Sequence, residues 1–356
     1  MLNENTKYKF IDLFAGIGGI RTAFERQGYN CVLSSEIDSD CRDVYYKNYG
    51  EMPFGDVRDL VSDCIEKYSV ITAGFPCQPF SICGRKKGFE DTRGTLFFEI
   101  CRIIKDTNPE VVFLENVKHL LHHDSGRTLE LILSSLEDLG YIATYKILNA
   151  IHFGVPQNRE RIIIIGSKKK EFDFSKVKKT TTIAKLIDFL EPTDNFEYLR
   201  PDEYTFIENP TTQPTGLIFC GYRNKGIWKK GIRPNSEHLS RVHRQPNRIY
   251  SVLGTHPTIP SQETSGRFFI YIPKENAVRK LTIKECYKIM GFDYEFKMSS
   301  NRGNAYKQVG NSVCIPMIEA IAKEIKNQLL KSSEYNYEPR RKTNRIVQQE
   351  LALQFT

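Results

Sequence analysis

The first half of the chain alternates between short apolar runs and stretches with helical periodicity. The apolar runs predict strands at residues 9–14, 31–35, 69–73, 111–115 and 161–166. Amphipathic stretches between them predict helices at residues 19–27, 40–48, 96–105 and 128–139. This alternation is typical of a parallel sheet that helices cover on both faces. Ligands of such sheets bind beyond the carboxyl ends of the strands.

Beyond residue 166 the regular alternation stops. Three lysines at 168–170 are followed by prolines at 192, 201, 210 and 214, which interrupt long elements. Between residues 217 and 250, eight basic side chains accompany a single acid, Glu237. Helical periodicity returns at 282–290 and again after Pro316. There one apolar stripe is formed by Cys314, Ile318, Ile321, Ile325 and Leu329.

This change of pattern predicts two domains and a tail. Residues 1–190 and 276–330 are assigned to the larger α/β domain, and residues 191–275 to a smaller domain with a basic, polar surface. Residues 331–356, which contain Arg340-Arg341-Lys342, are predicted to form a loose basic tail.

Composition excludes several classes of protein. The 356 residues are 40% hydrophobic and 26% charged, which is ordinary globular composition. No run approaches the roughly 20 apolar residues that a membrane span needs. The polar start MLNENTKYKF lacks a signal-peptide segment, so we expect a cytoplasmic protein.

Charge and cysteine content narrow the picture further. The net charge of +8 weakly favours an anionic partner. The nine cysteines include no C-x-x-C pair, so we expect neither a disulfide framework nor a metal site.

A glycine-rich turn, Phe10-Ile-Asp-Leu-Phe-Ala-Gly-Ile-Gly-Gly19, follows the first predicted strand and opens a helix. Glycines there let backbone N–H groups approach a ligand at the helix N-terminus. Glu36 lies 18 positions past Gly18, where a carboxylate can bind both hydroxyls of a ribose, and Asp56 is a further acceptor. These features favour a nucleotide site over a simple tight turn. Arg21 stands where the dinucleotide-binding pattern G-x-G-x-x-G has its third glycine. The loop alone does not distinguish a dinucleotide from S-adenosylmethionine as the ligand.

Cys77 lies between two prolines at a predicted strand end, in Ala73-Gly-Phe-Pro-Cys-Gln-Pro-Phe-Ser81. The prolines stiffen this turn and place the thiol for attack, whereas Cys101 and Cys286 lie on helical faces where packing is expected. A cysteine in a loop is more often a bystander, so this position needs further support. The basic, glycine-punctuated segment 84–88 is placed as a lid over a phosphate chain would be.

Two further segments supply that support. Glu115 ends an otherwise apolar strand, where burial raises a carboxyl pKa and favours proton donation. Arg159 and Arg161, in Gln157-Asn-Arg-Glu-Arg161, precede the next strand and enter the same end of the sheet. A purely structural ion pair is the alternative role for both arginines. For Arg159 the structural and the functional role are about equally favoured.

Together these residues resemble a DNA (cytosine-5) methyltransferase of the bacterial restriction–modification type. The resemblance covers nearly the whole chain, and its motifs occur in the order of the family. They are DLFAGIGG (12–19), Glu36, Asp56, GFPCQPFS (74–81), ENV (115–117), QNRER (157–161), RIYSVLGTHPT (248–258), RKLTIKECYKIMGF (279–292) and GNSV (310–313). The resemblance implies a Rossmann-like S-adenosylmethionine-dependent methyltransferase sheet with a second, smaller target-recognition domain.

The resemblance also implies a cofactor site. Glu36 would hold the ribose of S-adenosylmethionine, Asp56 its adenine amino group, and Phe14 an adenine face; S-adenosylhomocysteine would be the product. The implied lining is Phe14, Gly16, Gly18, Glu36, Ile37, Asp56, Val57, Pro76, Leu96 and Asn311. No metal is implied.

For catalysis, the resemblance makes Cys77 the nucleophile, and Glu115 would bind the N3 edge of cytosine. Arg161 would contact the base, and Arg159 is grouped with it. Contacts to DNA are expected from Gln78, Ser81, Arg223, Arg241, Arg244 and Arg248. The partner would be double-stranded DNA in a salt-sensitive cleft between the domains. We expect a monomer, with a cognate restriction endonuclease in the same system.

Two alternatives stay open. An RNA-modifying branch of the family shares these motifs and would act on tRNA, but its usual Cys-Phe-Thr signature is missing, since Cys220 is followed by Gly221 and Tyr222. The second alternative is a non-catalytic DNA-binding relative, which would have no reason to keep all three of Cys77, Glu115 and Arg161.

Overall fold

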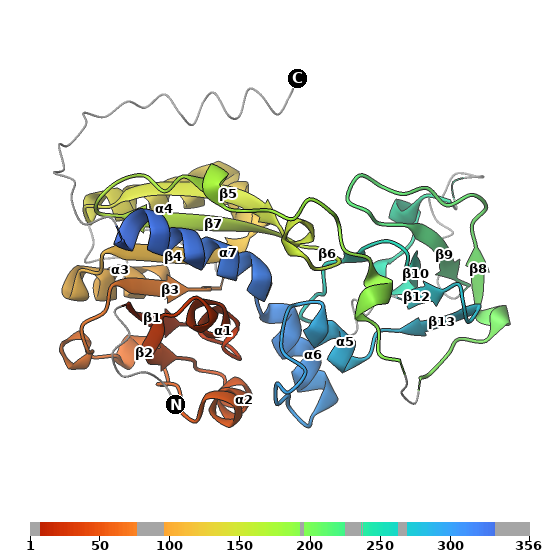
Figure 1. The fold of residues 1–356 in the computed structure, drawn as a ribbon, viewed down its shortest axis with the longest axis horizontal. Coiled ribbons are helices and arrows are strands. Elements are labelled where there is room, and N and C mark those ends of the chain that lie inside the picture. The colour runs from red at the N-terminus through yellow and green to blue at the C-terminus, as the bar shows by residue number, and fades with distance from the viewer. Residues whose placement is uncertain are drawn as a thin grey trace, which may run out of the picture.

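The computed structural model describes residues 8–76, 96–192, 196–224, 236, 238–262 and 269–331. A six-stranded sheet and a five-stranded sheet lie at opposite ends of the molecule, with helices α5 (Ile283–Lys288) and α6 (Arg302–Asn311) between them (Figure 1). The bounds of the two predicted domains and of the predicted tail stay a prediction.

The six-stranded sheet has the strand order β2-β1-β3-β4-β7-β5. Its strands are β1 (Lys9–Leu13), β2 (Asn30–Ser35), β3 (Val70–Ala73), β4 (Val111–Val117), β5 (Ile142–Asn149) and β7 (Glu160–Ser167). Strands β2, β1, β3 and β4 run parallel. All five strands predicted from the sequence are present within two residues of their expected bounds, because each is a buried apolar run.

The expectation of a fully parallel sheet is wrong. Strand β7 pairs antiparallel with both β4 and β5. Only ten residues, 150–159, join β5 to β7, and a parallel crossover needs about a dozen or more. Strand β5 was not predicted, because it is an edge strand whose side chains are mostly half-buried and leave a weak apolar signal.

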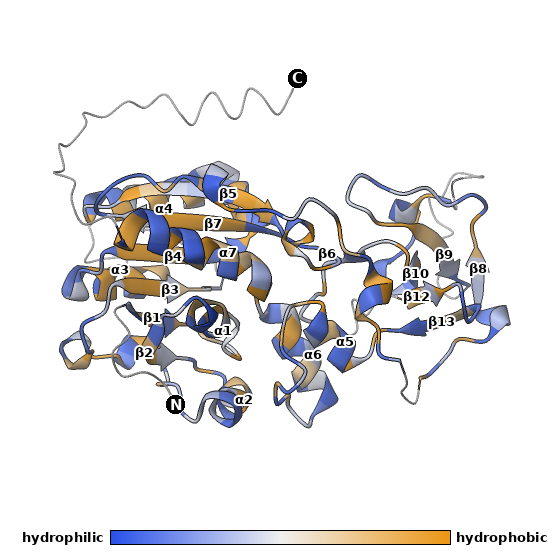
Figure 2. Cartoon of the chain, viewed as in Figure 1, coloured by the Kyte–Doolittle hydropathy of each residue, from blue (hydrophilic) through white to orange (hydrophobic). Residues whose placement is uncertain are grey.

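Helices cover both faces of this sheet. They are α1 (Gly19–Arg26), α2 (Ser39–Tyr49), α3 (Leu96–Thr107), α4 (Arg127–Asp138) and α7 (Ile315–Ile325), which continues as a π-helix over Lys326–Leu330. Alternate residues of β4 divide between the two faces: Val111 and Phe113 pack with α1 and α7, and Val112 and Leu114 pack with α3 and α4. The apolar strands accordingly form the inner layer, and the helices that cover them have polar outer faces (Figure 2).

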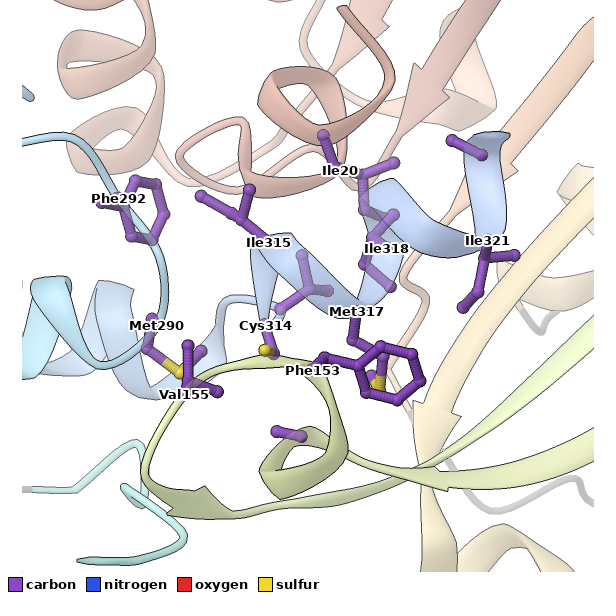
Figure 3. Close-up of a cluster of buried hydrophobic side chains, with 14 of the residues drawn as sticks. Ile20, Phe153, Val155, Met290, Phe292, Cys314, Ile315, Met317, Ile318 and Ile321 are labelled. Carbon is purple, nitrogen blue, oxygen red and sulfur yellow. The ribbon is translucent and has the colours of Figure 1, made fainter. Parts of the chain in front are cut away.

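Helix α7 joins the last part of the chain to the first sheet. Its predicted stripe is confirmed, since Cys314, Ile318, Ile321, Ile325 and Leu329 are all fully buried. Ile315 and Ile318 approach Ile20 of α1, and Met317 lies beside Phe153 (Figure 3). The core on this face of the six-stranded sheet therefore joins two helices that lie almost 300 residues apart in the chain.

The five-stranded sheet has the order β13-β12-β10-β9-β8. Its strands are β8 (Tyr204–Phe206), β9 (Phe219–Arg223), β10 (Arg248–Ser251), β12 (Phe269–Ile272) and β13 (Ala277–Lys280). A two-stranded sheet of β6 (Gln157–Asn158) and β11 (His256–Pro257) links the two ends of the molecule (Figure 1). Within the described residues, no helix is both long and apolar enough to span a membrane.

Candidate functional site

A pocket of about 680 Å³ lies at the carboxyl edge of the six-stranded sheet. Its walls come from the loop between β1 and α1, the ends of β2, β3 and β4, and the end of α6. The predicted cofactor residues among its lining are Phe14, Gly16, Glu36, Ile37, Asp56, Val57, Pro76, Leu96 and Asn311. The predicted catalytic residues Glu115, Arg159 and Arg161 line the same pocket.

The glycine-rich loop is held by Glu36 at the end of β2. Phe14 and Gly16 have a φ of 56°, which bends the backbone and turns the Gly16 N–H toward the carboxylate. Glu36 Oε2 accepts from Gly16 N at 2.8 Å, and Oε1 accepts from Asp38 N at 2.8 Å. Each carboxylate oxygen has further acceptor capacity. Glu36 is therefore fixed in place and can still accept from ribose hydroxyls.

Gly18 differs from the other predicted cofactor residues, since it is not among the described residues that line the pocket. A Cβ at Gly18 would lie 2.4 Å from the Tyr49 ring, and its φ is 85°. The Tyr49 hydroxyl donates to Gly18 O at 2.8 Å. Gly18 thus permits the close approach of α2 to the start of α1.

Arg21 explains the departure from the dinucleotide pattern. Its side chain is 2% exposed, and it forms ion pairs with Glu25 and Glu51. Its guanidinium carbon lies 4.5 Å from the centroid of the Tyr49 ring. Arg21 therefore fastens α1 to α2, and it does not line the pocket within the described part of the chain.

Asp56 lies on the pocket wall with an arginine beside it. Asp56 Oδ1 accepts from the backbone N–H of Arg58 at 3.0 Å, and the two side chains form an ion pair. The hydrogen bonds from Arg58 lower the pKa of Asp56. Asp56 is therefore an ionised hydrogen-bond acceptor on the pocket wall.

Glu115 and Arg161 face each other because β7 is antiparallel. The register pairs Val117 of β4 with Arg161 of β7, which brings the start of β7 to the carboxyl end of β4. Arg161 Nε lies 3.0 Å from Glu115 Oε1, with both side chains close to 90% buried. Burial raises the pKa of the Glu115 carboxyl, as the sequence suggested, and Arg161 opposes that rise. The pair places an arginine and an acid of raised pKa in one enclosed site.

Arg159 forms no ion pair with any described residue. It is 1% exposed, and its guanidinium donates to three backbone carbonyls: Ile259 O at 3.1 Å, Gly310 O at 3.0 Å and Ser312 O at 2.5 Å. Burial and the neighbouring Arg161 lower the pKa of Arg159. This geometry makes Arg159 a positioning residue that holds two distant segments against the pocket.

Two buried residues near the pocket were not singled out from the sequence. Asp12 of β1 is fully buried and accepts from Thr72 Oγ1 at 2.7 Å, and burial raises its pKa to about 7. Asn116, next to Glu115, donates to Phe75 O at 2.9 Å and so holds the chain just before residue 77. The available signal was a polar residue inside an otherwise apolar strand, which implies a specific buried partner.

The predicted DNA contacts divide into two groups. Gln78 and Ser81 lie outside the described residues, as does the predicted nucleophile Cys77. The other four lie in or next to the five-stranded sheet: Arg223 ends β9, Arg248 begins β10, and Arg241 and Arg244 are exposed in the segment before β10. None of these four arginines lines the pocket, as far as the chain is described.

Across the described ranges, no group of three or more His, Cys, Asp or Glu side chains is arranged to hold a metal ion. Seven cysteines are described and all are free; Cys101 and Cys286 are buried on helices, as predicted.

Comparison with known proteins agrees with this geometry. A family model described as C-5 cytosine-specific DNA methylase matches residues 8–327. Type II methyltransferase M.HhaI of Haemophilus parahaemolyticus is 38% identical over 333 residues, covering 91% of this chain and 96% of that relative. Type II methyltransferase M.DsaV of Dactylococcopsis salina is 40% identical over 330 residues, which cover 90% of this chain and 87% of that relative.

Solved structures confirm the fold. The Dnmt2 methyltransferase of S. pombe superposes with a TM-score of 0.64 at 17% identity, covering 91% of this chain and 99% of that one. A putative DNA modification methyltransferase encoded within an E. coli prophage superposes with a TM-score of 0.65 at 19% identity, covering 92% of this chain and 100% of that one. The Rossmann-like methyltransferase fold expected from the sequence is therefore present. From its motifs, its fold and the match over 320 of its residues, the chain belongs to the C-5 cytosine-specific DNA methylase family.

Proposed function

We propose that this cytosine-5 methyltransferase transfers a methyl group from S-adenosylmethionine to C5 of a cytosine swung out of a specific duplex sequence. The observation that carries the proposal is the shared pocket, in which the Glu115–Arg161 pair meets the glycine-rich loop held by Glu36. A loop suited to bind a nucleotide and an acid–arginine pair line the same pocket. This arrangement supports the transfer of a group from a nucleotide-like cofactor to a base.

The pocket residues fit S-adenosylmethionine. Glu36 would bind the ribose hydroxyls, Asp56 the adenine amino group, and Phe14 a face of the adenine ring. The remaining predicted cofactor residues on the pocket wall would enclose the molecule, and Gly18 would act through the packing of α1 on α2. When bound, this cofactor supplies an electrophilic methyl group and leaves as S-adenosylhomocysteine.

The chemistry is assigned to Cys77. Its thiolate would add to C6 of cytosine, which ends the aromaticity of the ring and gives C5 enamine character. C5 then takes the methyl group, the C5 proton is lost to a base, and elimination of the sulfur from C6 restores the ring. A free thiol has a pKa near 8.5, so only a small fraction is thiolate at neutral pH. Arg161, a cation in the same pocket as Pro76, would favour that fraction.

Glu115 would act on the opposite side of the base. Its carboxyl group, whose pKa burial raises, can hydrogen-bond or protonate N3 and so withdraw the charge that develops as sulfur adds. Arg161 would fix the Glu115 carboxyl and contact the base. Arg159 would hold the pocket wall through its three carbonyl contacts.

The DNA would lie between the six-stranded and five-stranded sheets. Extruding a base from a duplex costs a few kcal/mol, which phosphate contacts offset. Gln78 and Ser81 would contact DNA beside the nucleophile, and Arg223, Arg241, Arg244 and Arg248 would contact it from the second sheet. On this assignment residues 191–275 are the target-recognition domain, residues 1–190 and 276–330 the catalytic domain, and residues 331–356 a basic tail.

Relatives that are named Type II methyltransferases support a role in a restriction–modification system. We therefore infer that the protein acts as a cytoplasmic monomer that protects sites which a cognate endonuclease cuts. Nothing in the described residues favours tRNA over duplex DNA as the substrate.

The decisive experiment traps the covalent adduct. A methylated plasmid is first mapped to find the target cytosine, and an oligonucleotide with 5-fluorocytosine at that position is then incubated with enzyme and S-adenosylmethionine. Fluorine cannot leave as a proton does, so we expect a stable protein–DNA adduct in the mass spectrum.

Cys77→Ser should lose the adduct and methyl transfer while keeping duplex binding, and Cys83→Ser serves as the matched cysteine control. If the wild-type enzyme is active but its mass stays unchanged after incubation with the fluorinated oligonucleotide, the covalent mechanism is refuted. Faster methylation of tRNA than of DNA would refute the substrate.

A further inference from the structure

A second hollow, of about 580 Å³, lies where the five-stranded sheet meets α5 and α6. Four of its described lining residues are basic, namely Arg223, Lys280, Lys284 and Arg302, and one is acidic, Glu197. We call this surface the basic hollow. Neither the catalytic pocket nor the predicted cofactor site includes any of its residues.

Two of these cations are held against one aromatic ring. The guanidinium carbon of Arg223 lies 5.0 Å from the centroid of the Phe269 ring, and Lys280 Nζ lies 5.4 Å from it. Phe269 and Lys280 are directly paired across β12 and β13. Like charges that share one ring repel each other, and an anion between them relieves the repulsion.

Two of these cations, Arg223 and Lys284, have an acid near the limit of ion-pair distance. The closest Glu203 oxygen is 3.9 Å from Arg223 Nη2, and Glu191 is 3.9 Å from Lys284 Nζ. Lys284 is 57% exposed in its side chain, and Arg302 is exposed at the start of α6. The hollow therefore presents accessible positive charge to solvent.

Helix α6 connects the basic hollow to the catalytic pocket. Arg302, its first residue, lines the hollow, and Asn311, its last, lines the pocket. At about 1.5 Å per residue, the two ends of this helix are roughly 14 Å apart. Successive nucleotides of a duplex strand rise about 3.4 Å, so this distance corresponds to roughly four nucleotides. A duplex that delivers a base to the pocket and runs along α6 would bring its flanking backbone within reach of the hollow.

We propose that the basic hollow binds backbone phosphates of the duplex that flanks the target cytosine, independently of the base sequence there. This inference rests on the proposed function, because it needs duplex DNA as the substrate. Phosphate contacts from lysine and arginine set the position of a protein on DNA, and base contacts set the specificity. The hollow would fix the register of the duplex while the target base enters the pocket.

The test measures duplex binding by fluorescence anisotropy over a series of salt concentrations. Lys284→Gln and Arg302→Gln each remove one exposed charge of the hollow. Lys105→Gln, near the far end of α3 from the pocket, is the charge-matched control. Each hollow variant should lower the slope of log K against log salt by about 0.9, so that the affinity lost between about 50 and 200 mM salt shrinks by about threefold.

The control should keep the wild-type slope. The affinity lost by each hollow variant should also be equal for a cognate and an unrelated duplex, because every duplex carries the same phosphates. Slopes equal to that of Lys105→Gln would overturn the proposal, and so would a loss confined to the cognate duplex. Both results leave the proposed function intact provided that the wild type methylates DNA, whereas a wild type that methylates no duplex contradicts the proposed function itself.

Discussion

At the scale of single residues, two buried carboxyl groups near the pocket differ in their partners. Glu115 faces the guanidinium of Arg161 at 3.0 Å, which favours its charged form against the effect of burial. Asp12 has the Thr72 hydroxyl as its nearest donor, and burial outweighs that hydrogen bond and the charge of Arg21. The first carboxyl group is suited to exchange a proton during a reaction, and the second stays protonated to a much higher pH than an exposed aspartate does.

Replacing Glu115 with glutamine tests its proposed chemical role. The Glu115→Gln side chain keeps its size but cannot give up a proton to N3, so we expect single-turnover methyl transfer to fall by roughly 10²- to 10⁴-fold. Glu110→Gln is the matched control, since Glu110 begins the same strand region but pairs with Lys169 at the surface. Equal rates for wild type and Glu115→Gln would remove Glu115 from the mechanism.

Asp12 predicts a pH dependence of stability. Its pKa in the folded protein, about 7, is above its ordinary value of 3.8, so its contribution is greatest at low pH and is lost as pH rises toward 7. The amide of the Asp12→Asn variant cannot ionise. Between pH 5 and 8, the free energy of unfolding of Asp12→Asn relative to wild type should therefore rise by about 3 kcal/mol. Urea denaturation of both proteins at the two pH values measures this difference, and a constant difference would show that Asp12 does not titrate there.

At the scale of elements, the glycine-rich loop both lines the pocket and allows helix packing. Gly16 donates its N–H to Glu36 beside the pocket, whereas Gly18 provides room for the Tyr49 ring of α2. Tyr49 cannot move away cheaply, since its hydroxyl also lies 2.6 Å from Thr22 Oγ1. One short motif therefore affects both the packing of the first two helices and the shape of the pocket.

Gly18→Ala should destabilise the protein more than Gly16→Ala. Both positions have positive φ, but a Cβ at Gly16 would meet nothing within 4 Å, and one at Gly18 would overlap Tyr49. We expect strain of about 1 kcal/mol for Gly16→Ala and about 3 kcal/mol for Gly18→Ala. Thermal unfolding of both variants gives the comparison. Adding Tyr49→Ala should recover part of the loss only in the Gly18 variant, and equal losses without that recovery would contradict the packing role.

At the scale of the whole molecule, the chain passes twice between the two large sheets, and Glu285 of α5 ties both passages together. Its carboxylate accepts from Arg279 Nη1 at 2.8 Å and Nη2 at 2.7 Å, and from the backbone N–H groups of Glu191 and Thr282. Both charged side chains are nearly inaccessible to water. One buried ion pair therefore joins the two segments of chain that connect the sheets.

Breaking this pair should be costly. Glu285→Gln leaves Arg279 buried without its counter-charge, and we expect the free energy of unfolding to fall by about 3 to 5 kcal/mol. Asp202→Asn, which breaks an exposed pair with Arg200, should cost about 0.5 kcal/mol or less. Urea midpoints of the two variants test this. A loss in Glu285→Gln no larger than in the control would mean that the junction is held by apolar packing.

The sequence alone determined the local elements, and it predicted the chemistry that we propose for the pocket. The bounds of β1 to β4 and α1 to α4 follow from apolar periodicity, because each pattern involves neighbouring residues only. The glycine-rich turn, Glu36 and Glu115 likewise pointed to the carboxyl edge of the sheet, since each lies at the end of a predicted strand.

The tertiary structure decided what depends on distant partners. The direction of β7 depends on its insertion between β4 and β5, and it is this direction that brings Arg161 to Glu115. Arg159 binds carbonyls 100 and 151 residues away, which no local pattern encodes. Asp12 and Gly18 were visible in the sequence, but their roles came only from what packs against them, because burial and close approach are properties of the assembled molecule.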